Sequence, residues 1–225
     1  MLAIQISLKK NAYHLGEPIP ASVVYRNNGT SAISLEDPSR SFNAEMHVVD
    51  RSTKEDHYYT MGKLEVTEFE GGLGEYALVE PVPDSIDIAP KADFVFETDI
   101  NKRLYLGPGV FDCEFRDSDT RSNQATIAIW YTQDSVALLL GAVMDASLDY
   151  GRREWAADWL RELLPDFRVT LPPDGEEPGS APDDSVNQAE YQRFRAWWQE
   201  NRDSAETKQT LEQLNRVINS AGPLR

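Results

Sequence analysis

The first 133 residues alternate apolar and polar side chains with a period of two, the pattern of strands that are buried on one face. The alternation is clearest at Leu2, Ile4, Ile6 and Leu8, and again at Ile19, Ala21, Val23 and Tyr25. The same pattern predicts further strands at 32–35, 42–49, 64–69, 76–79, 94–98, 109–115 and 125–131.

Turn-forming residues separate these strands, at Gly16 and Pro18, Asn28 and Gly29, Asp37 and Pro38, and Gly107 to Gly109. Residues 116–124 begin with an Asp-x-Asp pattern but lack the glycine and the glutamate of a calcium loop, so we interpret them as a hairpin turn. Many short strands joined by turns, with no helix between them, predict an antiparallel immunoglobulin-like β-sandwich over residues 1–133.

The period changes to that of a helix near Asp134, which we expect to be an N-cap. Apolar residues then recur at helical spacing until Pro165 ends the pattern, at Val136, Leu139, Leu140, Val143, Met144, Trp155, Trp159, Leu160 and Leu163. The chain is therefore predicted to be α+β in two parts, with a small all-α helical domain at 134–225 following the sandwich.

Residues 172–185 combine prolines and acidic residues without a basic one, and predict a mobile loop. Two helices are expected after it. Variants of the capping box open them, Asn187 with Glu190 and Asp203 with Glu206.

Hydrophobic residues make up 40% of the chain and charged residues 27%, which is typical of a globular protein. The net charge is −16, and no cluster of Lys and Arg is present. We therefore expect no binding to nucleic acid or to an anionic membrane surface, whereas a basic protein is an acceptable partner.

The lone Cys113 excludes an intrachain disulfide and favours a cytoplasmic location. The alternating start at Leu2–Leu8 is predicted to be a strand rather than a signal peptide, although a leader removed earlier would leave the same sequence. The longest apolar run, at 136–144, is too short to span a bilayer.

Catalytic signatures are missing: the sequence has no nucleophile elbow, no zinc-binding His-Glu-x-x-His and no phosphate-binding glycine loop. His14, His47 and His57 are not at metal-ligand spacing. Cys113 lies between two phenylalanines of the same strand face and is expected in the core. We therefore predict no enzyme activity, no cofactor and no metal site.

The best candidate for a binding surface is the acidic segment between Lys63 and Lys91, which carries no basic residue. Its acidic residues could meet a basic partner, with aromatic residues as anchors, at Glu65, Glu68, Phe69, Glu70, Glu75 and Tyr76. The alternative is a solvated hairpin. Trp197 is a further candidate, because adjacent tryptophans on a helix point about 100° apart and Trp198 shares its stripe with Tyr191 and Phe194. Trp197 is then expected either to pack at the junction of the two domains or to lie exposed for a partner.

Two stretches resemble known families. "YHLGEPIPASVVYRNNGTSAISL", "FNAEMHVVD" and "LGPGVFDCEF" resemble the macroglobulin-like and BsuPI-type intracellular proteinase inhibitor domains, with Phe111 as the late aromatic residue. This resemblance covers about residues 2–131 and implies a β-sandwich and proteinase inhibition. "REWAADWLRELLP" and "YQRFRAWWQENR" resemble helices of HEAT-like repeat proteins, although only one such unit is present.

The leading hypothesis is a non-catalytic protein-binding module, with inhibition or neutralisation of a basic protein as special cases. One alternative is a hydrolase with a site between sandwich and helices that uses Glu154 or Asp158. The other alternative is a structural accessory subunit.

Overall fold

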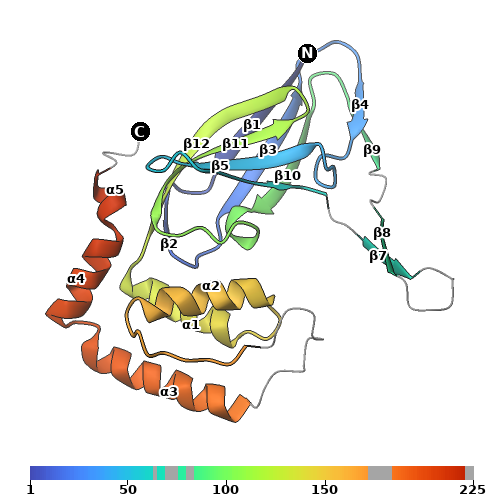
Figure 1. Ribbon diagram of the computed structural model, residues 1–225. Helices are drawn as coiled ribbons and strands as arrows, with labels where there is room; N and C mark the ends of the chain where they lie inside the picture. Colours follow the sequence, from blue (N-terminus) through green and yellow to red (C-terminus); the bar gives the residue numbers. More distant parts are fainter. Residues whose placement is uncertain (63–64, 69–75, 80–83, 172–183, 221–225) are drawn as a thin grey trace. The chain divides into compact units, whose positions relative to one another are not determined.

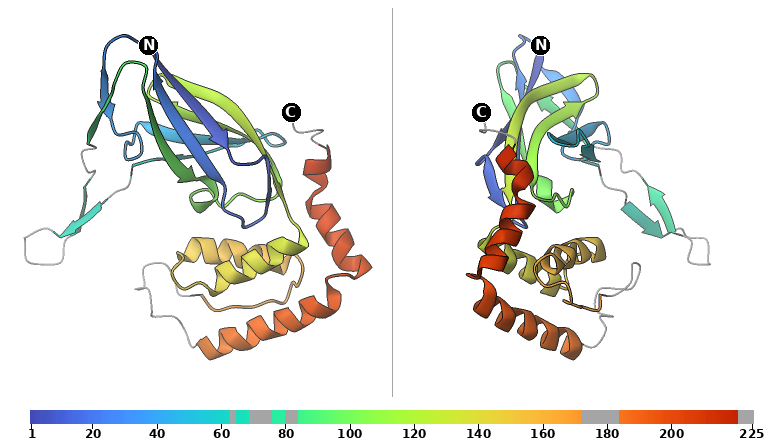
Figure 2. Two further views of the ribbon diagram at one scale, coloured as in Figure 1. Left: turned by 180° about the vertical axis from the view of Figure 1, so that it is seen from behind. Right: turned by 60° about the vertical axis from the view of Figure 1, so that its left-hand side comes forward.

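The computed structural model describes residues 1–62, 65–68, 76–79, 84–171 and 184–220, and its strands precede its α-helices (Figure 1). Figure 2 follows the same order from two further sides, from blue and green strands to yellow and red helices. The protein is therefore a mixed α and β structure. No helix within these ranges is long and apolar enough to cross a membrane.

The strands of the described chain are β1 Leu2–Leu8, β2 Ala12–His14, β3 Pro20–Asn27, β4 Ile33–Glu36, β5 Ala44–Asp50, β6 Asp56–Thr60, β7 Glu65–Glu68, β8 Tyr76–Val79, β9 Ser85–Ile88, β10 Asp93–Asp99, β11 Gly109–Asp117 and β12 Thr120–Trp130. A 3-10 helix, η1, covers Ile100–Lys102. Each strand predicted from alternation is confirmed. The prediction missed β2, β6 and β9, which are short, and β6 is also largely polar in sequence.

The helices are α1 Gln133–Met144, α2 Tyr150–Arg161, α3 Asp184–Asn201, α4 Ala205–Leu214 and α5 Arg216–Ser220. The helical periodicity is confirmed, but all three predicted N-caps are displaced. Thr132, not Asp134, is the N-cap of α1, because its hydroxyl accepts from the Ser135 backbone N–H. Ser204, not Asp203, is the N-cap of α4.

Asn187 lies inside α3 and is not its cap, which corrects the predicted helix start. Its side-chain amide instead accepts a hydrogen bond from the Thr170 backbone N–H at 2.9 Å and donates one to the Thr170 carbonyl at 2.8 Å. The predicted mobile loop at 172–185 lies outside the described residues except for its last two positions.

The chain divides into two compact units that interleave along the sequence. The first unit comprises Met1–Asn11, Ile19–Leu104 and Phe111–Ile127, and the second comprises Ala12–Pro18, Tyr105–Val110 and Ala128–Arg225. The boundary expected between residues 133 and 134 stays a prediction.

In the first unit, an antiparallel sheet of order β1-β3-β10 faces strands from a second sheet, in which β12, β11, β5 and β6 are neighbours. The contact between the sheets is aromatic: Phe115 of β11 packs edge-on against Tyr25 of β3 and Phe96 of β10, with ring centroids 6.2 and 5.6 Å apart. The Tyr25 hydroxyl donates to Asp117 at 2.8 Å, so the buried ring keeps its polar end paired. Two short antiparallel pairs, β4 with β9 and β7 with β8, complete the strand pairing.

In the second unit, β2 pairs in parallel with the last residues of β12, and α1 and α2 pack against each other. The buried core includes Tyr131, Leu139, Leu160 and Phe194. Arg153 is also buried, and its guanidinium donates to the Val143 carbonyl at 3.0 Å, so the end of α1 is tied to α2.

The start of α1 is tied to the C-terminal helices by Asn215, which ends α4. The Asn215 amide accepts from the Tyr131 backbone N–H at 2.9 Å and donates to the Tyr131 carbonyl at 2.8 Å. Both residues are buried, so the two hydrogen bonds are shielded from solvent. One side chain thereby satisfies the donor and the acceptor of a residue that leads from β12 into α1.

We predict that Asn215→Ala lowers the free energy of unfolding by about 2–4 kcal/mol, because it leaves a buried N–H and a buried carbonyl unpaired. Urea unfolding measures this value. The control is Asn219→Ala at an exposed position of α5, which should change it by less than about 0.5 kcal/mol. Equal losses in the two variants would contradict the role of Asn215.

Candidate functional site

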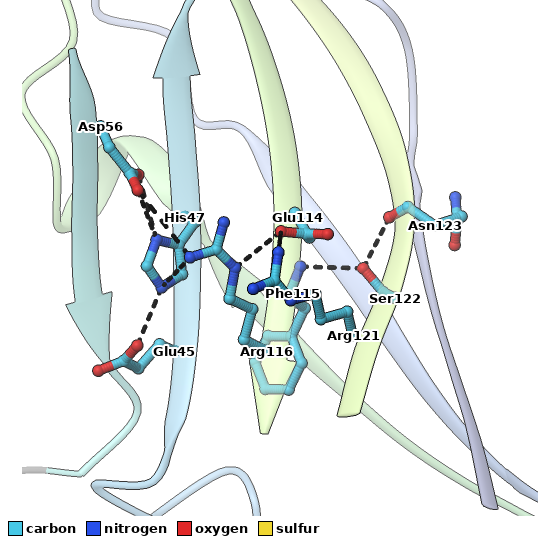
Figure 3. A network of polar contacts seen from close by, with 9 residues as sticks. All are labelled: Glu45, His47, Asp56, Glu114, Phe115, Arg116, Arg121, Ser122 and Asn123. Carbon is cyan, nitrogen blue, oxygen red and sulfur yellow. Dashed lines mark hydrogen bonds and ion pairs between the residues drawn. The ribbon is translucent and has the colours of Figure 1, made fainter. Parts of the chain in front are cut away.

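A network of charged side chains covers one face of the sheet in the first unit (Figure 3). At its centre His47 of β5 is only 6% exposed and lies between two carboxylates. Glu45 is 2.9 Å from Nε2, and Asp56 of β6 is 3.0 Å from Nδ1. The imidazole also stacks on Tyr58, with ring centroids 5.4 Å apart.

The network continues across β11, where Arg116 donates to Glu114 at 2.7 Å and lies 3.4 Å from His47 Nε2. A catalytic histidine needs one ring nitrogen facing a nucleophile while the other is held by a carboxylate. Here carboxylates face both nitrogens of His47. The arrangement therefore pairs charges across neighbouring strands and is poorly suited to base catalysis.

Cys113 is fully buried, as predicted, and burial raises the pKa of its thiol to about 12. The thiolate form that a nucleophile requires is thus disfavoured at neutral pH.

The predicted acidic surface is described only in part. Glu65 and Glu68 lie on β7 and Tyr76 lies on β8, with Glu68 paired to Tyr76 and Glu65 to Val79 in the antiparallel register. Phe69, Glu70 and Glu75 lie outside the described residues. The role of this surface therefore stays a prediction.

Trp197, the other predicted binding residue, is half-buried in the second unit. Its ring packs against Phe194 and Trp198, with centroids 5.6 and 6.2 Å away. Tyr191 and Phe194 are buried, as their shared stripe predicted, whereas Trp198 is half-buried. Trp198 borders a surface hollow.

That hollow lies between α1 and α3 and has a volume of about 320 Å³. Its walls are mostly apolar, with Val136, Leu140 and Gly141 from α1 and Phe194 and Trp198 from α3. A volume of this size and a largely apolar lining are typical of a ligand site.

A second, more open hollow of about 570 Å³ adjoins it, because Ala137 and Trp198 border both. We call the two hollows together the α1–α3 trough. The outer end of the second hollow is polar, with His14 and Glu17 before α1 and Asp134 in its first turn.

Contacts between α1 and α3 fix the direction of the trough. Arg195 Nη2 lies 3.8 Å from the sulfur of Met144, at the end of α1. Gln133, at the start of α1, donates to the Arg202 carbonyl at 2.9 Å. The two helices are thus antiparallel, with Arg195 at one end of the trough and Arg202 at the other.

The side of α1 that borders the trough is apolar although it is open. Ala137, Leu138 and Gly141 are exposed, Leu138 by 37%, and a methyl group added at Gly141 would meet no atom within 4 Å. The opposite side buries Leu139 and Val143. Contiguous apolar surface that is exposed on a small protein often marks an interaction site.

Sequence reasoning missed the trough, although one signal was present. Between Asp134 and Asp145 the chain carries no charged residue, so α1 is apolar on every side. A helix of this kind is buried all round or is incompletely covered.

No protein-family model and no curated protein sequence matches the chain. Several solved structures resemble 57% of it. The Pseudomonas fluorescens alkylpurine DNA glycosylase AlkC, bound to DNA containing an abasic site analog, is 12% identical with a TM-score of 0.34, and 30% of its chain is covered. A β-glucosidase from Listeria innocua in complex with glucose is 8% identical, with a TM-score of 0.33 and 16% of its chain covered.

The CARDB domain of the PF1109 protein from Pyrococcus furiosus, in complex with di-metal ions, is 8% identical with a TM-score of 0.31, and 87% of that chain is covered. This chain thus spans less than a third of the glycosylase and of the glucosidase. TM-scores this low carry no argument about fold or activity. The resemblances to proteinase inhibitors and to HEAT-like repeats are not confirmed by these comparisons.

We predict that Gly141→Ala raises the free energy of unfolding by about 0.5–1 kcal/mol, because alanine favours the helix and its methyl group enters open space. The matched comparison is Gly107→Ala, whose methyl group would lie 2.8 Å from Trp159 Cζ2 and should cost about 1–3 kcal/mol. Urea unfolding of both variants tests the description, and destabilisation by Gly141→Ala would mean that the trough is filled.

Proposed function

We propose that this protein is a non-catalytic protein-binding module whose α1–α3 trough receives part of a partner protein. The observation that carries the proposal is the open apolar side of α1, bordered by the half-buried ring of Trp198. Tryptophan and arginine dominate the binding energy of protein interfaces when they line desolvated pockets. The trough offers one tryptophan between two arginines, Arg195 and Arg202.

The paired state of the polar groups supports a role without catalysis. Both nitrogens of His47 face carboxylates, and Cys113 is buried with a raised pKa. In the alternative hydrolase, Glu154 or Asp158 would act as the acid or base. Glu154 accepts from Tyr150, and Asp158 pairs with Arg161. Both carboxylates are exposed on α2, and we find no observation that favours the hydrolase or the accessory subunit.

For the first unit we propose an immunoglobulin-like sandwich, supported by the two sheets that meet at Tyr25, Phe96 and Phe115. Its acidic segment around Glu65 and Glu68 would add electrostatic steering toward a basic partner in the cytoplasm, given the net charge of −16. Inhibition or neutralisation of that partner remains part of the proposal.

Affinity capture from the source cells with quantitative mass spectrometry tests the proposal. We compare the wild-type chain with two variants. Gly141→Trp places an indole ring in the trough at a position where an added side chain meets no other atom, and Gly141→Ala is the matched control. We expect one protein to be enriched equally by the wild type and Gly141→Ala and to be reduced at least about tenfold by Gly141→Trp, since blocking an interface centre costs more than about 1.4 kcal/mol.

A third variant, with Glu68→Lys, Glu70→Lys and Glu75→Lys, distinguishes binding at the acidic segment from binding at the trough. A partner lost only from this chain would move the binding site to the acidic segment. A partner retained by every chain, including Gly141→Trp, would overturn the trough as the binding site. Circular dichroism of each variant confirms that folding is intact.

A further inference from the structure

We infer that the trough is built for an amphipathic helix that lies antiparallel to α1, with acidic residues in its first turns beside Arg195 and basic residues in its last turns beside Glu17 and Asp134. This inference rests on the proposed function and names the kind of partner that the site would take.

The walls of the trough favour a helix over an extended peptide. A bound strand gains most of its affinity from backbone hydrogen bonds to a sheet edge. Both long walls here are α-helices, α1 and α3, whose backbone groups are bonded within each helix. A ligand must therefore bind through its side chains, which is how a helix binds in a groove.

The floor of the trough lets a helix approach closely. Ala137 and Gly141 are four residues apart and so lie one above the other on α1. Neither carries a side chain beyond Cβ, and the space above Gly141 is open. The two hollows on either side of Trp198 would then accept two apolar side chains of the ligand, about one helical turn apart.

One end of the trough is positive. Arg195 is the charged residue that borders the first hollow, and its guanidinium lies near the sulfur of Met144. No carboxylate within the described ranges forms an ion pair with it. The nearby Asp145 turns its carboxylate back to Ser147, at 2.9 Å from the backbone N–H and 2.6 Å from the hydroxyl.

The other end is negative. Glu17 accepts from the His14 backbone N–H at 3.0 Å, and the carboxylate of Asp134 is 80% exposed and lies 3.7 Å from His14 Nε2. Arg202 also borders this hollow, but its guanidinium pairs with Asp203 at 3.6 Å. The carboxylates of Glu17, Asp134 and Asp203 thus outnumber the basic groups of Arg202 and His14 at this end, and a basic side chain of the ligand would be favoured there.

These charges set the direction of the ligand. Helices are stabilised by acidic residues in the first turn and basic residues in the last turn, because of the helix dipole. A helix with that ordinary distribution matches the trough only when its first turn lies at Arg195. Arg195 lies on α3 and Arg202 directly follows its last residue, so the two are separated by about 10.5 Å at 1.5 Å per residue, and the acidic and basic residues of the ligand should be about seven positions apart.

The test uses two fluorescein-labelled 18-residue peptides of identical composition, with leucines at positions i, i+3, i+4 and i+7. The forward peptide has glutamates in its first two turns and lysines in its last two, and the reverse peptide exchanges them. Fluorescence anisotropy with the full chain should give at least about threefold tighter binding of the forward peptide, since exposed ion pairs are individually weak.

The two peptides also differ in helicity, so charge variants of the protein are used to isolate the contribution of the trough. Arg195→Glu should abolish or invert the preference, whereas Arg216→Glu, the same charge change at an exposed position of α5, should preserve it. Gly141→Trp should weaken both peptides at least about tenfold.

Equal affinity of the two peptides for the wild type, or an unchanged preference in Arg195→Glu, would overturn the proposed direction. Failure of both peptides to bind would overturn the helix as the ligand. A captured partner that is still lost from Gly141→Trp would, in that case, leave the protein-binding function standing.

Discussion

The structure of the second unit depends on the burial of α1, a helix that carries one charged residue in twelve. Burying an aliphatic side chain stabilises a fold by about 1.5–3 kcal/mol relative to leaving it exposed. Four side chains of α1 are buried in this way, at Val136, Leu139, Leu140 and Val143. The remaining side of the helix is equally apolar, but the described residues leave it open. A helix covered on one side only is what creates the trough.

The contacts that hold α1 also shape the ends of the trough. Asn215 fixes Tyr131, and Thr132 caps the helix and bonds His14 at 2.9 Å. The turn that begins at Gly16 packs on the same helix, since a methyl group at Gly16 would lie 3.2 Å from Leu138 Cβ. Gly16 has a φ of +86°, a conformation in which glycine is favoured. The turn formed by the Gly-Glu-Pro sequence thus places Glu17 at the acidic end of the trough.

Much of the fold could be predicted because it follows from local periodicity. Alternation located the main strands, and helical spacing located the helical segments, but it did not predict the break between α1 and α2. Two caps were displaced by only one or two residues, from Asp134 to Thr132 and from Asp203 to Ser204, whereas the largest error occurred where a distant partner decides the role of a side chain. Asn187 has the sequence context of a cap, yet Thr170 takes its amide. The trough could not be predicted, because it requires α1 and α3 to lie side by side, and no local pattern specifies which side of α1 is left uncovered.

The central claim is that the apolar side of α1 is open to solvent in the free protein. Leu138→Cys tests it directly, because the native Cys113 is buried with a thiol pKa of about 12 and does not compete for an alkylating reagent. The account predicts that iodoacetamide modifies Cys at position 138 of the folded chain within about tenfold of its rate in urea, as expected for a site that reacts without unfolding. A rate at least about a hundredfold slower than in urea would contradict the account, because α1 would then be covered already.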